Sequence, residues 1–491
     1  MACIAISLLL MIGVSAAGPS IVVPGMHHTS GAPPWWGPLH LPGGVLFVMW
    51  GAAVIAAIGV AAGLIAVARG WRPSIRMLLA SSFIAVAAFA VLPPAGSTDA
   101  QSYAIDGSMV VLHHSPYVDT PAQMARQGDK FAVNSPKTWQ NAKSDYGPLA
   151  TAEEWLSAEL GGWSLAQVTF WLKLWVELAF VAVTLLLDRV LRSNPTMRLR
   201  AHLLWSVNPL VLWEIVAAGH IDGLAVAFGL AGLLMMRFPR PDVRPSLLHC
   251  AGAGALIGLA ADVKSPFLLF GLGAAWAARK FPAALAALAA GAAVILVPSY
   301  AAFGKPAVSV LFNRSDQVTW DNLYQVFYRP LGLSKFGADN IPAHVSTIAT
   351  VAFIVIALLA FIRMPDRVPG LPAVTPALAL SIGWIFLWPF QRPWYDVMII
   401  ALLALYPRSW LDWVVLGRLC FGAITYMESA SVSGHSTLQD IQLFQGEWIT
   451  SSVRLLSVIA LIYMCVTQRW GFSSETETSP PVGEPLLQPQ G

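Results

Sequence analysis

Charged side chains are scarce in this chain of 491 residues. Asp, Glu, Lys and Arg together make up 11% of it, whereas hydrophobic residues make up 56%. A soluble domain carries about 25% charged residues, so the composition excludes a soluble protein. Uncharged apolar segments recur, and those near twenty residues are long enough to cross a hydrocarbon core of about 30 Å as helices. We therefore predict an all-α fold, a polytopic transmembrane helical bundle.

Cysteine and metal-binding motifs are scarce as well. The four cysteines lie in apolar runs without CxxC spacing, which argues against a disulfide framework and against a thiolate metal site. There is no HExxH pair, so a divalent metal is not expected, and no cofactor is identified. The net charge of +3 comes from basic residues spread along the chain rather than gathered in a patch. A nucleic-acid partner is therefore not expected.

The first apolar segment lacks the basic residues that begin a signal peptide. The stretch Val14 to Ala17 resembles a small-residue cleavage site, but no Lys or Arg precedes the apolar region. We therefore expect a retained first span.

Hydropathy predicts about fourteen spans. They cover residues 2–23, 44–68, 77–95, 165–188, 202–218, 223–237, 247–262, 266–279, 282–303, 346–362, 371–390, 394–407, 410–427 and 449–467. Together they form one membrane domain, 1–470. The remaining segment, 471–491, is rich in Pro, Glu and Ser and is predicted to be a disordered cytoplasmic tail.

Short basic loops predict the orientation in the membrane. Arg69, Arg72 and Arg76 share one loop, and further Arg and Lys clusters fall in loops on the same side. Because such loops favour the cytoplasm, both termini are expected there, in a multi-pass protein of the plasma membrane. The opposite, extracytoplasmic side then receives a long loop, 96–164, expected to form a helical subdomain, and a second outer loop, 304–345.

An acidic residue, Asp99, follows the end of the third predicted span, 77–95. Asp99, in "STDAQSYAIDG", would lie at the outer surface, where water can keep a carboxylate ionised. It is a candidate general base. The alternative is an interfacial acid that only marks the membrane boundary.

Two cations lie on the same predicted side, against the usual charge bias. Lys264 in "DVKSP" and Arg392 in "QRPWYD" are candidate ligands of a phosphate. Lys264 could instead extend to lipid head groups or pair with Asp262. Trp394 and Tyr395, next to Arg392, could stack on a sugar or could belong to an interfacial aromatic belt.

The segment "AGHIDG" places His220 and Asp222 where one apolar run turns into the next. A histidine beside a carboxylate could bind a metal or carry a proton, but no second histidine has zinc-site spacing. A hydrogen-bonded turn is favoured.

These groups suit glycosyl transfer from a lipid-linked phosphosugar. The leaving group departs as a phosphate anion, so cations that stabilise it act on the transition state and no general acid is required. One base suffices to take the proton from the attacking sugar hydroxyl.

The ordered motifs "TDAQSYAIDGSMVVLHHSPYVDTP", "TWQNAKSDYGPL", "LLWSVNPLVLWEIVAAGHIDGL", "LAADVKSPFLL" and "RPWYD" resemble actinobacterial polyprenol-phosphate-mannose-dependent α-1,6-mannosyltransferases of the GT-C superfamily. The resemblance spans about residues 75–410. It implies a GT-C-like bundle and inverting transfer from polyprenyl phosphomannose to a mannan-type lipoglycan acceptor on the extracytoplasmic face. Gln101 departs from the family pattern, and so does the pair Ile221-Asp222 after the motif histidine.

The resemblance also implies roles for individual residues. Asp99 corresponds to the catalytic acid. The other motif positions, which are candidates for binding the donor and the sugars, are Tyr103, Tyr117, Tyr146, His220, Asp222, Lys264, Trp394 and Tyr395.

Two alternatives stay open. A transferase that takes arabinofuranose or glucose from a lipid phosphate would share every feature above, because fold does not fix substrate. A secondary transporter would also have many spans and broken helices. Against a transporter, the polar clusters gather at one predicted face, and no repeated halves are seen.

Overall fold

The protein is described by a computed structural model over residues 1–17, 31–37, 39, 43–137, 139–237, 245–311, 318–331, 343–427 and 436–471. All regular structure in these ranges is helical, which confirms the predicted all-α class. Except for Gly471, the predicted tail 471–491 lies outside the described residues. Parts of the predicted outer loop 304–345 do as well.

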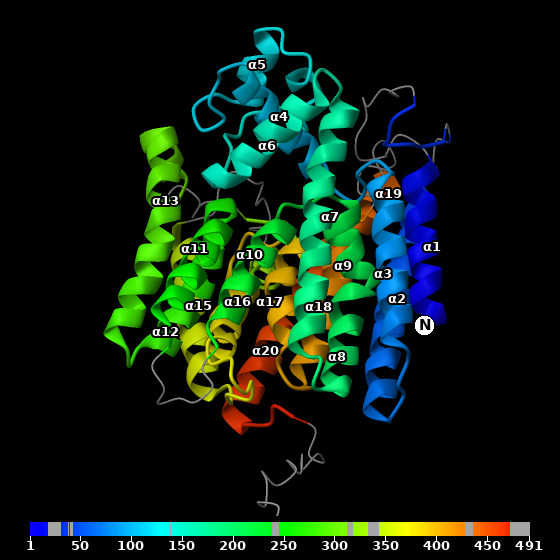
Figure 1. Ribbon diagram of the computed structural model, residues 1–491. Helices are drawn as coiled ribbons and strands as arrows, with labels where there is room; N and C mark the ends of the chain where they lie inside the picture. The colour runs from blue at the N-terminus through cyan, green and yellow to red at the C-terminus, as the bar shows by residue number, and fades with distance from the viewer. Residues whose placement is uncertain are drawn as a thin grey trace, which may run out of the picture.

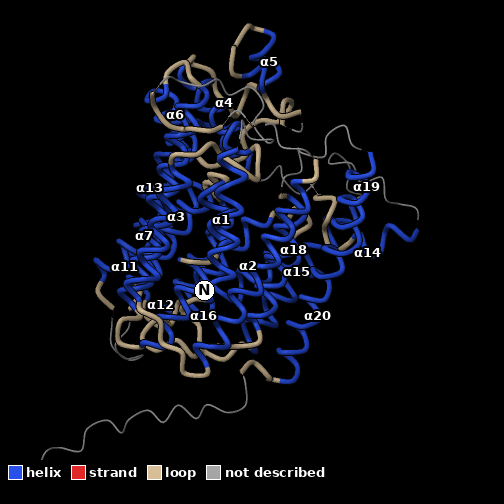
Figure 2. Tube along the Cα trace, turned by 90° about the vertical axis from the view of Figure 1, so that its right-hand side faces the viewer, coloured by secondary structure: helices blue, strands red, loops and turns tan. Residues whose placement is uncertain are grey.

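The first part of the chain builds one flank of the bundle and a separate cluster of helices at one end. The flank is formed by α1 (Ala2–Ala17), α2 (Val45–Ala68) and α3 (Ile75–Ala90). The cluster, here called the cap, comprises α4 (Asp99–Val111), α5 (Pro121–Arg126), η1 (Ala132–Asn134) and α6 (Pro148–Gly161). Figures 1 and 2 both show the cap at the same end of the helical bundle.

The middle of the chain returns along the bundle and then breaks. Its elements are α7 (Leu165–Val190), α8 (Pro195–Ala201), the π-helix η2 (His202–Ser206), α9 (Pro209–Val211), the π-helix η3 (Leu212–Ala217) and α10 (Asp222–Met235). The segment Pro195–Ala217 is bent by 115° relative to α10. The break falls at the predicted turn that carries His220. Non-helical backbone at membrane depth is tolerated where it lines a cavity or is buried in protein.

The remaining elements complete the bundle. They are α11 (Leu247–Val263), η4 (Ser265–Phe267), α12 (Leu268–Ala278), α13 (Pro282–Val310), α14 (Gln325–Tyr328), η5 (Arg329–Leu331), α15 (Ala343–Arg363), α16 (Val374–Leu387), η6 (Pro393–Asp396), α17 (Val397–Leu403), α18 (Leu411–Tyr426), α19 (Ser436–Phe444), the π-helix η8 (Gln445–Thr450) and α20 (Ser451–Thr467). In Figure 1, α13 stands at the edge of the molecule, and its apolar residues are mostly exposed.

The described residues contain fewer long apolar helices than the number of spans that hydropathy predicts. Among the described residues, five helices are long and apolar enough to cross a membrane, or six if the bent pair counts as one span. The expectation of about fourteen is not confirmed, because six other apolar helices have only 10 to 17 residues. Several of these, such as α16 and α17, are almost wholly buried by neighbouring helices. Their hydrophobic sequence therefore reflects contact with protein rather than the length needed to span lipid.

A buried lysine holds the turn that leads into the cap. Lys173, in the middle of α7, donates hydrogen bonds from Nζ to the carbonyl oxygens of Phe89 and Leu92, the latter at 2.8 Å. These carbonyls belong to the end of α3, where a helix leaves acceptors without intrahelical partners. The contact fixes the chain a few residues before Asp99.

A close backbone approach joins the cap to α11. The Gly147 N–H donates to the carbonyl oxygen of Val263 at 3.1 Å. A Cβ at residue 147 would lie 1.9 Å from the carbonyl oxygen of Asp262, so only glycine fits. This contact brings Tyr146 next to Lys264, although more than a hundred residues separate them in sequence.

Candidate active site

A pocket lies between the cap and the bundle. Its lining comes from α4, the segment before α6, and the segment around η6: Asp99, Ser102, Tyr103, Asp106, Pro121, Trp139, Ala142, Lys143, Ser144, Asp145, Tyr146, Phe390, Arg392, Trp394 and Tyr395. Six of the ten residues predicted from sequence are in this lining. His220, Asp222 and Lys264 lie directly behind it, through the contacts below.

Asp99 is the first residue of α4, and it is 9% exposed. Its own backbone N–H donates to Ser97 Oγ at 3.1 Å, which fixes the start of the helix. Burial raises the pKa of the Asp99 carboxyl above its ordinary value, while the positive charges of Arg392 and Lys264 act in the opposite direction. A carboxyl held in this way keeps proton affinity while it faces cations, as a general base requires.

A neighbour of Asp99 behind the pocket wall is His220. Its Nδ1 donates a hydrogen bond to the backbone carbonyl oxygen of Glu214. Because a carbonyl oxygen can only accept, Nδ1 carries the proton of the neutral ring, and Nε2 carries the lone pair. Nε2 lies 3.7 Å from Asp99 Oδ2. The ring stacks on Trp394 with 3.8 Å between centroids. Gly219 allows this turn, because its φ is +72° and a Cβ there would lie 2.8 Å from Lys173 Cγ.

Lys264 is paired with a carboxylate, and the partner is Asp222. Lys264 Nζ donates to Asp222 Oδ1 at 2.7 Å, and both side chains are buried. The alternative pairing with Asp262 is not found, because Asp262 accepts hydrogen bonds from Ser299 Oγ at 2.7 and 2.6 Å. Nζ also lies 3.7 Å from the centroid of the Tyr395 ring. The predicted turn containing Asp222 therefore serves to hold and neutralise Lys264.

Arg392 differs, because it forms no ion pair within the described part of the chain. Its guanidinium is surrounded by rings instead, at 4.7 Å from the centroid of Tyr426, 4.9 Å from Phe390, 5.7 Å from Trp394 and 5.9 Å from Trp139. Aromatic faces stabilise a cation without neutralising its charge. The pocket wall thus carries a guanidinium whose positive charge is available to an anion.

Three of the four tyrosines predicted from sequence fall into two groups. Tyr103 and Tyr146 share a hydroxyl–hydroxyl hydrogen bond of 3.0 Å and line the pocket. Tyr117 does not line it. Its hydroxyl bonds to Thr151 Oγ1 at 2.7 Å and donates to the carbonyl oxygen of Tyr146 at 3.1 Å. Tyr117 therefore supports Tyr146 from behind.

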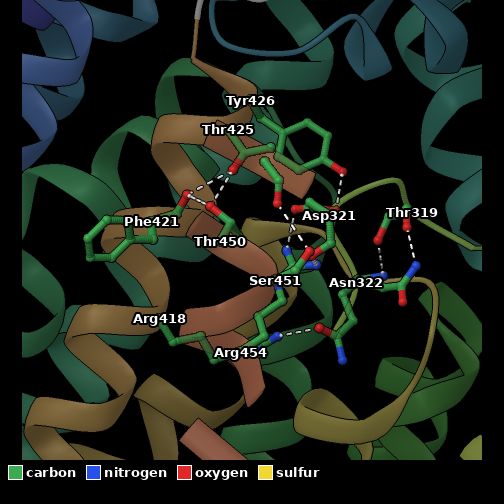
Figure 3. A network of polar contacts seen from close by, with 12 residues as sticks. Thr319, Asp321, Asn322, Arg418, Phe421, Thr425, Tyr426, Thr450, Ser451 and Arg454 are labelled. Carbon is green, nitrogen blue, oxygen red and sulfur yellow. Dashed lines mark hydrogen bonds and ion pairs between the residues drawn. The ribbon is translucent and has the colours of Figure 1, made fainter. Parts of the chain in front are cut away.

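A polar network holds the ring below Arg392 in place (Figure 3). The Tyr426 hydroxyl donates to Asp321 Oδ1 at 3.1 Å, and Arg454 Nη2 lies 2.7 Å from Asp321 Oδ2. A second buried ion pair, Arg418 with Asp396 at 3.1 Å, anchors the end of the "QRPWYD" segment. Three segments that are far apart in sequence, near residues 321, 426 and 454, thus fix the ring that packs against Arg392, a residue of the pocket lining.

Sequence reasoning missed several lining residues. Asp106 lies seven residues after Asp99 on α4, so helical periodicity could have placed both acids on one face. Lys143 and Asp145 lie beside Tyr146, in a motif that was quoted only for its tyrosine. Tyr426 does not line the pocket, but its ring packs against Arg392. It had no signal in the sequence, because it is one aromatic residue at the end of an apolar run.

No group of three His, Cys, Asp or Glu side chains that could hold a metal ion is found among the described residues.

Apolar helices of membrane-spanning length, a capped pocket, a buried acid and an unneutralised guanidinium are together typical of a membrane glycosyltransferase. Residues 2–280 match the sequence model of the family described as alpha-(1->6)-mannopyranosyltransferase, N-terminal domain. The match covers more than half of the chain, and the protein belongs to this family of mannosyltransferases.

A curated relative agrees with this assignment. It is a probable alpha-(1->6)-mannopyranosyltransferase of Mycolicibacterium smegmatis (strain ATCC 700084 / mc(2)155), 25% identical over 201 residues. The aligned part is 36% of this chain and 35% of the relative, so the chain spans about a third of the length of the relative that it matches.

Proposed function

We propose that the protein is a membrane mannosyltransferase that transfers mannose from polyprenyl phosphomannose to a mannan-type lipoglycan acceptor, with inversion, on the extracytoplasmic face. The observation that carries this proposal is a single pocket lined by both Asp99 and the unneutralised Arg392. Membership of the alpha-(1->6)-mannopyranosyltransferase family supports the choice of sugar.

The reaction needs one base and one cation. Asp99 removes the proton from the acceptor hydroxyl as its oxygen attacks the anomeric carbon, and the bond from that carbon to the phosphate oxygen breaks. The electron pair of the broken bond stays on the polyprenyl phosphate. Arg392 stabilises this growing negative charge, which is larger in the transition state than in the bound donor. Attack opposite to the leaving group converts a β-linked donor into an α-linked product.

His220 can stabilise Asp99 after Asp99 has taken up the proton. Once Asp99 is protonated, its hydroxyl group can donate to His220 Nε2, which has no hydrogen-bond partner among the described residues. The resulting contact stabilises the protonated acid without placing a second positive charge beside it. Stacking on Trp394 keeps the ring in line with Asp99.

Lys264 retains a proposed supporting role at the phosphate. Because Asp222 neutralises it, its contribution to binding an anion is expected to be smaller than that of Arg392. Tyr103, Tyr146 and Tyr395 supply hydroxyls and ring faces suited to a sugar.

The experiment is transfer of radiolabelled mannose from polyprenyl phosphomannose in isolated membranes. Asp99→Asn should lower the rate by roughly 10²- to 10⁴-fold, as expected for loss of a general base, with expression unchanged. Asp119→Asn is the matched control, because this acid lies in the cap but outside the pocket, paired with His114 at 3.0 Å. Retained turnover in Asp99→Asn removes that residue from the base role.

The same assay decides the donor. Polyprenyl phosphates carrying glucose or arabinofuranose are supplied in place of the mannose donor, and efficient use of either would replace mannose in the proposal. Uptake of a sugar into proteoliposomes without a glycan product would favour the transporter instead. A transporter needs a site reached from both sides, whereas this pocket lies at the cap end of the bundle.

A further inference from the structure

A second hollow lies at the end of the bundle that is farther from the cap. It has a volume of about 720 Å³, against about 50 Å³ for the pocket under the cap. It is formed where α12 and α15 end and where α13 and α16 begin, and we call it the distal groove. Its polar and aromatic lining includes Trp276, Arg279, Lys280, Phe361, Asp366 and Arg367.

The charge of the distal groove is positive. Its lining contains three cations, Arg279, Lys280 and Arg367, and one carboxylate, Asp366, which accepts a hydrogen bond from Thr375 at 3.0 Å. None of the three cations forms an ion pair in the part of the chain that the structure describes. Arg279 is held in place instead, because its guanidinium lies 4.0 Å from the Trp276 ring centroid and donates to that residue's carbonyl oxygen at 2.7 Å.

Two apolar stripes run along helices that lead to this groove. On α12, exposed residues recur at helical spacing: Leu268, Leu272 and Trp276. On α15, exposed residues follow the same rule: Ile348, Val351, Val355, Leu358 and Ile362. The ends of the two helices meet through the Trp276 and Phe361 rings, whose centroids are 4.8 Å apart. In a bilayer these stripes face acyl chains, and the cations lie at the depth of head groups.

We propose that the distal groove binds the head group of an anionic phospholipid, with the acyl chains lying along the exposed faces of α12 and α15. Charge complementarity favours this occupant, because a basic pocket between membrane helices attracts a phosphate diester. Tryptophan at the rim is typical of the interface between head groups and chains. The groove is separate from the pocket under the cap, so this proposal does not depend on the transfer reaction.

The test measures thermal unfolding of the purified, delipidated full-length protein in detergent. Dioctanoyl phosphatidylglycerol, dioctanoyl phosphatidylcholine and inorganic phosphate are added separately. Wild-type protein should be stabilised by phosphatidylglycerol and not by the other two. The variant Arg279→Gln with Arg367→Gln should bind phosphatidylglycerol at least about tenfold more weakly, since each basic group near a lipid surface adds to the attraction of an anionic head group.

Two control variants guard against misfolding. Arg69→Gln with Arg192→Gln removes two exposed cations elsewhere and should respond to lipid as the wild type does. Arg279→Lys with Arg367→Lys keeps both charges and should retain binding. Equal stabilisation of the wild type and the groove variant by phosphatidylglycerol would overturn the proposal. It would also be overturned if inorganic phosphate reproduced the whole effect, or if phosphatidylcholine worked equally well.

Discussion

Two segments of the chain, around Lys264 and around Arg392, place a cation at or directly behind the wall of the pocket under the cap, and they surround it differently. Around Lys264, the sequence supplies a counter-ion, Asp222, at 2.7 Å. Around Arg392, it supplies aromatic rings. A buried charge that lacks a counter-ion is costly, and such a charge is retained where a ligand compensates it. The comparison indicates that Arg392 meets the anion, while Lys264 and Asp222 form a neutral support.

The largest expected difference between the two cations is in the transfer rate after each of them is removed in turn. Arg392→Gln should lower the transfer rate by about 10² to 10³-fold, the usual effect of losing one group that stabilises a developing anion. Lys264→Met combined with Asp222→Asn removes both members of the neutral pair and should cost less than tenfold. Initial rates at saturating donor measure both variants.

The single variant Lys264→Met is the control for the pair. It leaves Asp222 buried without its cation, which should destabilise the protein by about 3 to 5 kcal/mol. The melting temperature should recover in the double variant. If the double variant instead loses as much activity as Arg392→Gln, the charge of Lys264 is also required and the comparison is wrong.

The ring below Arg392 offers a smaller effect. Tyr426→Leu removes the face on which the guanidinium rests and should raise the KM for the donor several-fold, with a weaker effect on kcat. Tyr426→Phe keeps the ring but loses the hydrogen bond to Asp321, so most of the donor affinity should be restored. Equal KM values for the Leu and Phe variants would show that the ring does not position Arg392.

The acidic limb of the pH profile of activity tests the electrostatic coupling between Asp99 and Arg392. Burial raises the pKa of Asp99 and the Arg392 charge lowers it. A base acts when deprotonated, so activity should fall as the pH drops through that raised pKa. Removing the Arg392 charge raises the pKa further, and the limb of Arg392→Gln should move to higher pH. The shift is measured as the residual transfer of radiolabelled mannose by Arg392→Gln at a series of pH values. If the acidic limb does not move, the charge of Arg392 does not affect the pKa of Asp99.

The smallest expected effect concerns the cap alone. Burial raises the pKa of Asp106 to about 7 and that of Glu153 to about 8, and it also raises the pKa of Glu154. Acids with raised folded-state pKa values favour the folded protein when protonated, so stability should be lost as the pH rises through 7 to 8.

Glu154→Gln isolates this effect. The side chain is fully buried, and neither carboxyl oxygen has a hydrogen-bond partner among the described residues. The substitution should leave the melting temperature nearly unchanged at pH 5 and raise it by a few degrees at pH 8.5. A melting temperature that responds equally at both pH values would contradict the assignment of the pH dependence to this carboxyl.

The sequence alone led to six of the fifteen residues that line the pocket, and to less of the architecture. Asp99 and Arg392 could be found because a charge that interrupts an apolar run has few structural uses in a membrane protein. The partner of Lys264 could not, because Asp262 is two residues away and Asp222 is brought close only by packing. The predicted number of spans is not confirmed for a related reason. Helices α16 and α17 are surrounded by protein, and hydropathy does not distinguish burial in protein from contact with lipid.

The 115° break before α10 has one more consequence. A helix that starts inside a protein directs the partial positive charge of its backbone amides outward from its first turn. Here that first turn holds Asp222, behind the pocket wall. No side-chain substitution removes this backbone contribution. The variant Arg392→Gln should therefore keep a small, measurable rate above that of the uncatalysed reaction.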